Sequence, residues 1–315
     1  MGEALRSIEV LHTKMNVSYI SLSGHVEVEK YRYLYFVITS IVYSLIICSN
    51  CTIVGLIVVH KKLHEPMYIF IAALLINSLL FSTNIFPKLM IDFLSNEQII
   101  SYQACLFQCF TFYSLSCSEF LLLAAMSYDR YVSICKPLQY PTIMTGKKIS
   151  MFLVLAWLLP ACQIAVHVVK YSNFKLCSFT LKVIFCNNTI NNLFCEISRP
   201  LMMYGLVVMF NVAICPMFFI LFTYVKILII TCQSCGEVRR KAAQTCLPHL
   251  LVLINYSCLF TYDMVIVRVE ADLPKTACFI LTLQIITYNP LFNPIIYGLK
   301  MKEINEHIKN IFLSK

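Results

Sequence analysis

The chain alternates long apolar runs with short polar segments. Each run is close to the length of about 20 residues that a helix needs to cross a bilayer. The runs lie at residues 33–59, 67–90, 102–134, 149–169, 201–230, 242–262 and 277–297. Backbone polar groups at membrane depth must pair within their own segment, so each run is predicted to be a helix. The pattern therefore predicts an all-α membrane protein, a bundle of seven transmembrane helices.

The polar ends of the chain divide it into three expected parts. Residues 1–32 form an outer tail, residues 33–299 the transmembrane domain, and residues 300–315 a short tail on the opposite side. Apolar residues in the last part recur at helical spacing with lysines between them. They are Ile304, Ile308, Ile311 and Phe312. This pattern is typical of an amphipathic helix lying on the membrane surface.

Composition supports the membrane assignment and excludes several functions. Hydrophobic residues make up 59% and charged residues 13% of the chain, whereas soluble domains carry about 25% charged residues. The net charge of +9 is dispersed over short segments without a basic cluster, which argues against nucleic-acid binding. No nucleophile–base pair or phosphate loop is recognisable, so we predict neither an enzyme nor a bound cofactor.

The orientation follows from charge and from cysteine chemistry. Seven spans put the two ends on opposite sides, and a cytoplasmic C-terminus leaves more Lys and Arg inside than outside. Glycosylation sequons at Asn16 and Asn187 then lie outside. The same orientation places four cysteines on the oxidising side, at Cys105, Cys177, Cys186 and Cys195. Four cysteines allow three pairings, and the sequence alone does not choose between them.

The third apolar run ends in Asp129-Arg130-Tyr131, followed by Lys136-Pro137, where a helix should end. An arginine near the end of an apolar helix is costly unless it is paired or reaches water. Arg130 either extends to the interface as an ordinary anchor or forms a charge pair with Asp129 that acts as a switch. The tripeptide alone does not decide between these interpretations.

Glu119 lies eleven residues before Arg130, about 16 Å along a helix, which puts it near the middle of the bilayer. A carboxyl group at this depth must face the interior of the bundle. We favour a neutral acid hydrogen-bonded to neighbours such as Asn77 or Ser78. The alternative is a switch that holds sodium or a proton.

Cys232, Cys235, Cys246 and His249 imitate the spacing of zinc ligands. Two of them fall inside an apolar run, where the same three-residue spacing is ordinary helix packing. We therefore predict no metal site.

Seven spans with Asp129-Arg130-Tyr131 at the inner end of the third resemble a class A G-protein-coupled receptor. Further motifs of that class match in order, at Asn50, Trp157, Pro216, Tyr224 and Asn293-Pro294-Ile295-Ile296-Tyr297. The match narrows to the odorant receptors through Glu65-Pro66-Met67-Tyr68, Glu119 to Tyr131, Lys241-Ala242, Thr245-Cys246, His249-Leu250 and Pro290 to Pro294. The segment from Ser133 to Tyr140 looks like receptors of fish. The resemblance covers the chain from about residue 30 to its end.

The resemblance implies a receptor in the plasma membrane that binds a small odorant and activates a stimulatory G protein, raising cyclic AMP. It also implies the disulfides Cys105–Cys186 and Cys177–Cys195. Coupling would use residues at the inner ends of spans three, five and seven, namely Asp129, Arg130, Tyr131, Tyr224, Asn293, Pro294 and Tyr297.

Two departures from class A are notable. Most class A receptors carry an aspartate midway along span two, where this chain has Ser78, so a sodium site like theirs is in question. The Cys-Trp-x-Pro motif of span six is absent, and the segment reads Asn255-Tyr256-Ser257-Cys258. Odorant receptors also lack that tryptophan.

A ligand wall is expected on the outer half of span three. Cys109, Phe112, Tyr113 and Ser116 recur at helical spacing and share a face, although helix packing would use the same pattern. Facing residues would be Phe260, Thr261 and Met264 on span six, and Leu283 and Ile286 on span seven. Such a mostly apolar wall suits a small apolar ligand fixed by a few hydrogen bonds.

Two other functions are compatible with a membrane bundle. A small transporter would usually show inverted repeats and several ionisable groups at the midplane, but here only Glu119 qualifies. A non-olfactory class A receptor is the closer alternative. Amine receptors place an aspartate on span three near Phe112, and none is present.

Overall fold

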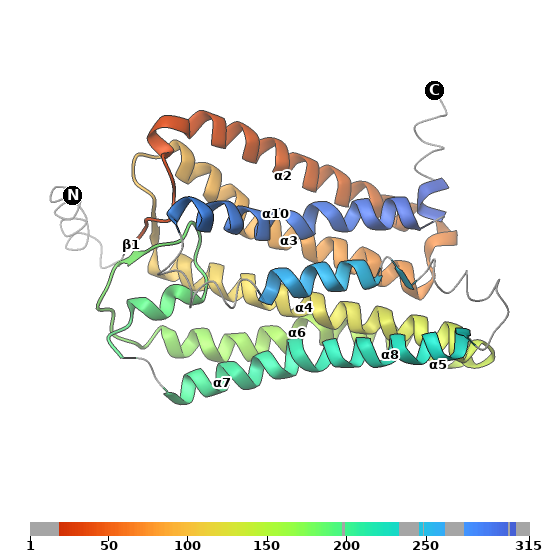
Figure 1. Cartoon of the computed structure of the whole chain (residues 1–315). Helices are drawn as coiled ribbons and strands as arrows, with labels where there is room; N and C mark the ends of the chain where they lie inside the picture. Colours follow the sequence, from red (N-terminus) through yellow and green to blue (C-terminus); the bar gives the residue numbers. More distant parts are fainter. Residues whose placement is uncertain are drawn as a thin grey trace, which may run out of the picture.

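The structure is a computed structural model and describes residues 19–196, 199–232, 246–247, 249–261, 274–301 and 303–306. The long helices pack side by side into one bundle, with strands at one end (Figure 1). Their bounds are α2 (Val28–Val59), α3 (Pro66–Leu94), α4 (Tyr102–Cys135), α6 (Gly146–Tyr171), α7 (Arg199–Met209), α8 (Cys215–Cys232) and α10 (Lys275–Lys300). A π-helical turn, η4 (Phe210–Ile214), joins α7 to α8 into one span.

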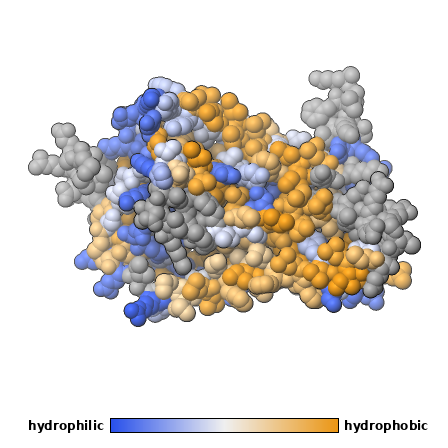
Figure 2. All heavy atoms as spheres, viewed as in Figure 1, coloured by the Kyte–Doolittle hydropathy of each residue, from blue (hydrophilic) through white to orange (hydrophobic). Residues whose placement is uncertain are grey.

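Six spans, Arg199–Cys232 being one of them, are long and apolar enough to cross a membrane, and a shorter apolar helix covers His249–Thr261. The seven-helix prediction is confirmed, and Figure 2 shows apolar side chains over much of the bundle's flank. The remainder of the predicted span 242–262 lies outside the described residues.

The ends of the helices follow local sequence signals. Pro66 opens α3 at its first turn, where the missing N–H costs nothing. The side chain of Ser101 accepts a hydrogen bond from the Ala104 N–H and caps α4. The same helix ends at Cys135, directly before Lys136-Pro137, as the sequence predicts. Short helices η2 (Pro137–Gln139) and α5 (Tyr140–Ile143) then connect α4 to α6.

A three-stranded sheet covers one end of the bundle. The predicted orientation places this end outside the cell, and we call it the outer end and the opposite one the inner end. Its central strand β1 (Tyr19–Leu22) comes from the N-terminal tail. It pairs antiparallel with β2 (Ile99–Ser101) and parallel with β3 (Thr180–Leu181). The last of these precedes the 3₁₀ helix η3 (Asn188–Leu193) in the same outer loop. The sequence predicted a polar outer tail for residues 1–32 and no strand within it. In the structure, Tyr19–Leu22 form a partly buried strand of this sheet, which we call the lid.

Gly24 follows β1 where the tail crosses the outer loop. A Cβ atom at this position would lie 2.4 Å from the backbone carbonyl carbon of Val183. Only glycine permits so close an approach of two backbones. The lid is therefore fixed by packing as well as by strand pairing.

His25, beside Gly24, makes the lid sensitive to acid. Burial lowers the pKa of His25 to about 4, and nearby Lys88 and Lys275 act in the same direction. Because the neutral ring is the folded form, its contribution to stability is complete above the unfolded pKa of about 6.5 and is lost as pH falls towards 4. We expect the free energy of unfolding to fall by about 2 kcal/mol between pH 7.5 and pH 5.

Thermal unfolding of the purified protein at the two pH values measures this effect. His25→Gln should flatten the pH dependence, whereas substitution of the half-buried His60 serves as the control. An unchanged pH profile in His25→Gln would show that other groups cause the acid sensitivity.

At the inner end, the chain after α10 returns to the bundle. Met301 and Ile304 are buried, and the hydroxyl of Tyr68 on α3 donates a 2.7 Å hydrogen bond to the Glu303 carboxylate. Ile304 thus faces protein and not the membrane surface. The other apolar positions of the predicted amphipathic helix, Ile308, Ile311 and Phe312, lie outside the described residues.

Candidate functional site

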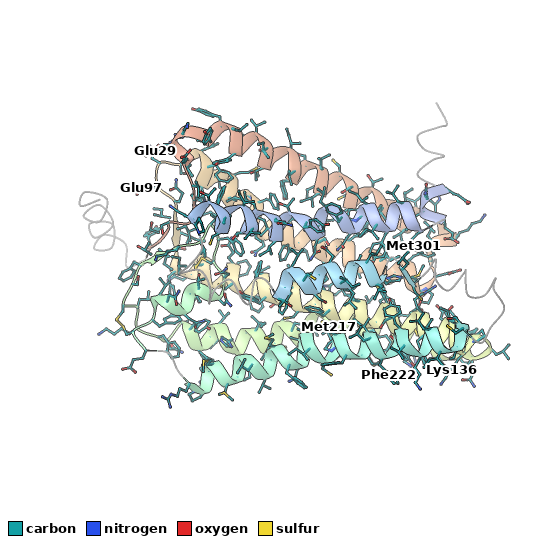
Figure 3. The ribbon with its side chains drawn as sticks, viewed as in Figure 1. Glu29, Glu97, Lys136, Met217, Phe222 and Met301 are labelled. Carbon is teal, nitrogen blue, oxygen red and sulfur yellow. A yellow bond between two sulfur atoms is a disulfide. The ribbon has the colours of Figure 1, made fainter. Side chains whose placement is uncertain are left out.

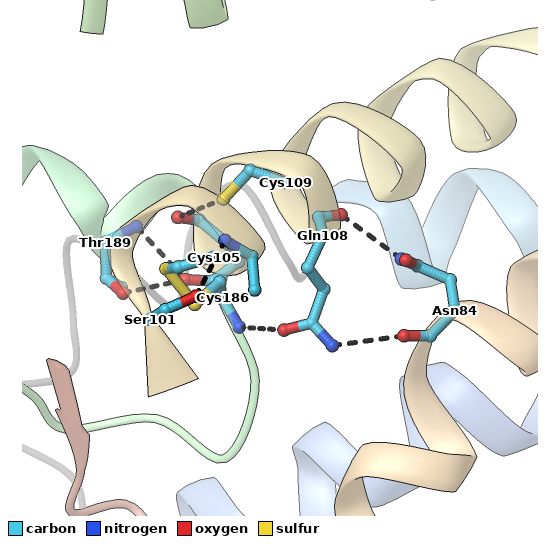
Figure 4. Close-up of a disulfide and its surroundings, with 9 residues drawn as sticks. Asn84, Ser101, Cys105, Gln108, Cys109, Cys186 and Thr189 are labelled. Atoms are coloured by element: carbon cyan, nitrogen blue, oxygen red, sulfur yellow. Dashed lines mark hydrogen bonds between the residues drawn. A yellow bond between two sulfur atoms is a disulfide. The ribbon is translucent and has the colours of Figure 1, made fainter. Parts of the chain in front are cut away.

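The outer loop between α6 and α7 is attached covalently to the bundle. The structure contains the disulfides Cys105–Cys186 and Cys177–Cys195, the pairing that the resemblance implies. The first joins α4 to the loop with a Cα–Cα distance of 5.4 Å (Figure 4), within the usual range for disulfides. It holds the loop over the outer half of the bundle.

Gln108 is a second attachment that the sequence analysis did not identify. Its Oε1 accepts a 2.9 Å hydrogen bond from the Cys186 N–H, and its Nε2 donates to the Asn84 carbonyl at 3.1 Å. Asn84 Nδ2 donates in return to the Gln108 carbonyl. These bonds connect α3, α4 and the loop (Figure 4). The sequence did contain a sign of this role, because Gln108 is a polar residue within an apolar helix, three positions after Cys105.

Phe112 is the centre of an aromatic cluster beneath the loop. Its side chain is 3% exposed. Its ring centroid lies 5.2 Å from that of Phe81, 4.9 Å from Tyr113 and 5.0 Å from the loop residue Phe185. Leu283 and Ile286 of α10 pack in the same cluster. The structure thus brings together the predicted residues of spans three and seven, and it adds Phe185 to them.

Two predicted ligand residues contact the loop backbone directly. The Tyr113 hydroxyl accepts a 3.0 Å hydrogen bond from the Asn188 N–H, and the Cys109 Sγ donates to the Asn187 carbonyl at 3.3 Å. Tyr113 therefore supports the loop in addition to any contact with a ligand.

The remaining predicted wall residues lie apart from this cluster. Ser116 is buried, and its carbonyl accepts a 2.6 Å hydrogen bond from the Tyr256 hydroxyl. Phe260 packs on Phe120 at 5.2 Å, in the core cluster below. Thr261 is exposed, which is not the position expected for the wall. Met264 lies outside the described residues.

The side chain of Asn187, the asparagine of a predicted glycosylation sequon, is buried and hydrogen-bonded within the folded loop. Asn187 is 4% exposed, and its Oδ1 accepts hydrogen bonds from both the N–H and the hydroxyl of Thr189. A glycan needs an accessible asparagine, so this arrangement argues against the predicted glycosylation at Asn187. Asn16 lies outside the described residues.

The inner end of α4 carries a buried charge pair. Asp129 is 0% exposed. Its Oδ2 accepts from Arg130 Nη2 at 2.6 Å, and its Oδ1 accepts from the Tyr140 hydroxyl at 2.8 Å. Burial, and Asp129 beside it, raise the pKa of Tyr140 well above its usual range, which keeps this hydroxyl a donor. Arg130 is thus a paired charge and not only an interfacial anchor.

The other expected coupling residues lie on facing helices. Tyr224 on α8 and Tyr297 on α10 are buried, and the Tyr297 hydroxyl lies 3.4 Å from His249 Nδ1. Pro294 is inside α10, while Tyr131 is half-buried on α4. The sequence did not predict a role for Tyr140, whose contact depends on how the inner loop folds back.

Glu119 has a different partner from the one expected. Its side chain is 5% exposed, and Oε1 accepts a 3.1 Å hydrogen bond from Asn293 Nδ2. Asn293 Nδ2 also donates to Ser78 Oγ at 3.3 Å. Asn77 is not a direct partner, because it donates to the Leu115 carbonyl and accepts from Trp157 Nε1. Glu119 is thus a hydrogen-bonded acid of the core.

A sodium ion of the class A kind does not fit these residues well. Hard cations need several oxygen ligands, and the span-two position where most class A receptors carry an aspartate is Ser78 here. Glu119 then has an amide N–H donor and a hydroxyl beside it and no second carboxylate at that position. Within the residues described by the structure, no group of three His, Cys, Asp or Glu side chains is arranged to hold a metal ion.

We expect Glu119→Gln to retain most of the agonist response, because glutamine preserves the shape and the hydrogen-bonding capacity of a neutral acid. Concentration–response curves in high and low sodium, at matched surface levels, test this. A sodium effect in the unsubstituted receptor that disappears in Glu119→Gln would contradict the neutral-acid interpretation.

Comparison with known proteins gives a consistent result. The family model described as olfactory receptor matches residues 39–315. Human olfactory receptor 11A1 is 32% identical over 298 residues, which cover 93% of each chain. Mouse olfactory receptor 2A7 is 32% identical over 295 residues, covering 88% of this chain and 90% of the relative. The suggested likeness to fish receptors stays a prediction.

Proposed function

This chain belongs to the olfactory receptor family, and on that premise we propose that it binds a small odorant within the bundle and raises cyclic AMP through a stimulatory G protein. It is a multi-pass membrane receptor and not an enzyme. The N-terminus would lie outside the cell and the C-terminus in the cytoplasm. The relatives exclude the transporter as a working alternative.

The observation that carries the proposal is the position of the aromatic cluster relative to the charge pair. Phe112 and Arg130 belong to the same helix, α4, at its outer and inner ends. A ligand that repositions Phe112 and its neighbours would act on a rigid element that ends at the Asp129–Arg130 pair. Glu119 and Asn293 lie between the two and join α4 to α10.

A ligand changes signalling only by binding one of two states more tightly than the other. In the structure, Arg130 is paired with Asp129, and we propose that this pairing belongs to the inactive state. In the active state, we propose that Arg130 leaves this partner and moves towards Tyr224 while Tyr297 turns inward. The opened inner cleft would accept a segment of the G protein.

The test is a screen of odorant mixtures in cells that express the receptor with a cyclic-AMP reporter. Cells expressing the Arg130→Ala variant provide the control for responses of other receptors. The proposal fails if no volatile mixture evokes a response from a receptor that reaches the cell surface. Coupling to another G protein would appear as a calcium response without cyclic AMP.

Phe112→Ala and Tyr113→Phe should each weaken the response to an identified agonist. Phe112 supplies the centre of the cluster, and Tyr113 supplies a hydroxyl that supports Asn188. Loss of one neutral hydrogen bond costs about 0.5–1.5 kcal/mol, so Tyr113→Phe should raise the half-maximal concentration roughly twofold to tenfold. Unchanged curves for both variants at matched surface levels would place the ligand elsewhere.

A further inference from the structure

One aromatic side chain near the inner end of α4 contacts both α6 and α8. Tyr128 of α4 is half-buried. Its ring centroid lies 5.7 Å from that of Phe152 on α6 and 6.4 Å from that of Phe219 on α8. Tyr128 directly precedes Asp129, so this contact lies at the level of the charge pair. Tyr128 therefore joins α6 and α8 through aromatic contacts, and we call Tyr128, Phe152 and Phe219 the inner aromatic contact.

Two lysines lie on the helices that contact Tyr128, Lys148 on α6 and Lys226 on α8. The Lys148 ammonium is 5.0 Å from the centroid of the Tyr128 ring and 3.2 Å from its hydroxyl. The Lys226 ammonium lies 5.6 Å over the ring of Phe222. Among the described residues, neither lysine forms an ion pair with a carboxylate. Within the described part of the chain, the groups found beside these two charges are aromatic rings and one hydroxyl.

The surroundings are those of a surface that faces lipid. Phe222 is 57% exposed, and Phe218, Phe219 and Val225 on α8 are exposed as well. Phe222 points away from the bundle at its edge (Figure 3). Because α8 is part of a membrane span, these apolar side chains face acyl chains. Lys226 is exposed among them, two residues after Tyr224, whose ring faces the region of Arg130.

We propose that this surface binds an anionic phospholipid of the inner leaflet. The phosphate would lie at Lys148 and the Tyr128 hydroxyl, and Lys226 on α8 would add a second positive charge on the neighbouring apolar surface. The acyl chains would follow Phe152 on one side and Phe219 and Phe222 on the other. Long basic side chains at this depth extend their charge towards the headgroups, and anionic lipids are concentrated in the cytoplasmic leaflet.

The charge argument favours a lipid over a protein partner as the main occupant. The inner aromatic contact and the exposed phenylalanines are apolar, like acyl chains. A soluble protein segment would have to enter the membrane to reach them. Each lysine near an anionic surface contributes about 1 kcal/mol, which corresponds to roughly fivefold in affinity. Two lysines should therefore give a preference of roughly 25-fold for an anionic over a neutral lipid.

The experiment uses the full-length receptor in nanodiscs containing phosphatidylcholine with and without phosphatidylserine. Native mass spectrometry measures the lipids that remain bound, without odorant and without G protein. We expect Lys148→Gln and Lys226→Gln each to reduce the preference for phosphatidylserine roughly fivefold. The double Arg variant should retain the preference, because it keeps both charges. A failure here would leave the proposed odorant response untouched, since no ligand is involved.

The matched control is Lys170→Gln. Lys170 is an exposed lysine on the same helix, α6, but near its outer end, so the substitution changes charge equally on the opposite side. Equal retention of the two lipids by the unsubstituted receptor would overturn the proposal. So would an equal loss in Lys170→Gln. If both glutamine variants keep the full preference for phosphatidylserine, the lipid site is wrong.

If a glutamine variant does not fold, a photoreactive phosphatidylserine gives an independent measurement on the unsubstituted receptor. Cross-links should map to the peptides that contain Phe152 and Phe222. Cross-links confined to other helices would contradict the proposal.

Discussion

Replacing Cys105 and Cys186 together by serine is expected to remove most of the receptor from the cell surface. A disulfide typically contributes about 2–4 kcal/mol to folding stability. This one joins residues 81 positions apart, and it holds the loop that carries Phe185 against Phe112. Removing both cysteines avoids a free thiol that would form the wrong pair.

The matched control is the double serine variant of Cys177 and Cys195, which are only 18 positions apart. In the chain-entropy description, the shorter loop contributes about 1 kcal/mol less, so this variant should reach the surface at a higher level. Surface immunolabelling of intact cells, with thermal unfolding of purified protein, measures both. Peptide mapping that finds Cys105 as a free thiol in mature protein would contradict the prediction.

Arg130→Ala is expected to abolish agonist-driven cyclic AMP. Among the described residues, Arg130 is the only charged partner of Asp129, which without it would keep the hydrogen bond from the Tyr140 hydroxyl. An unpaired buried carboxylate costs about 3–5 kcal/mol, so the variant should also be less stable. Surface level and signalling must therefore be measured together.

A second variant separates folding from coupling. Asp129→Asn combined with Arg130→Ala removes the unpaired charge, so surface expression should recover while signalling stays absent. Recovery of both in the double variant would show that Arg130 has no role in coupling. Tyr140→Phe should have a smaller effect, because it removes one hydrogen bond and leaves the ion pair in place.

The helices were predictable because each depends on a local run of apolar residues and on local end signals such as Pro66 and Pro137. The charge pair was also predictable, since Asp129 and Arg130 are adjacent. The partner of Glu119 was not, because Asn293 is 174 positions away and no local pattern connects them. The sequence correctly restricted Glu119 to the interior, and the structure then selected Asn293 over Asn77.

The structure at the outer end of the bundle was harder to predict from the sequence. Tyr19 to Leu22 alternate between half-buried and buried positions, which is a strand pattern, but four residues in a polar tail carry little weight. The role of Tyr113 was predicted only in part, for a similar reason. Helical spacing placed it on the correct face, while its contact with the Asn188 N–H depends on the path of a long loop.

The position of β1 also has a consequence for the order of biosynthesis. The strand is synthesised before the segments it pairs with. Ser21 pairs with Thr180, so the strand must wait until four membrane spans have been made. Contacts between distant parts of a chain form slowly because the intervening loop must first be closed. During this interval the strand has no pairing partner from β3. Formation of the complete sheet would then be a late step in maturation. A tag fused close to Tyr19 would delay this step.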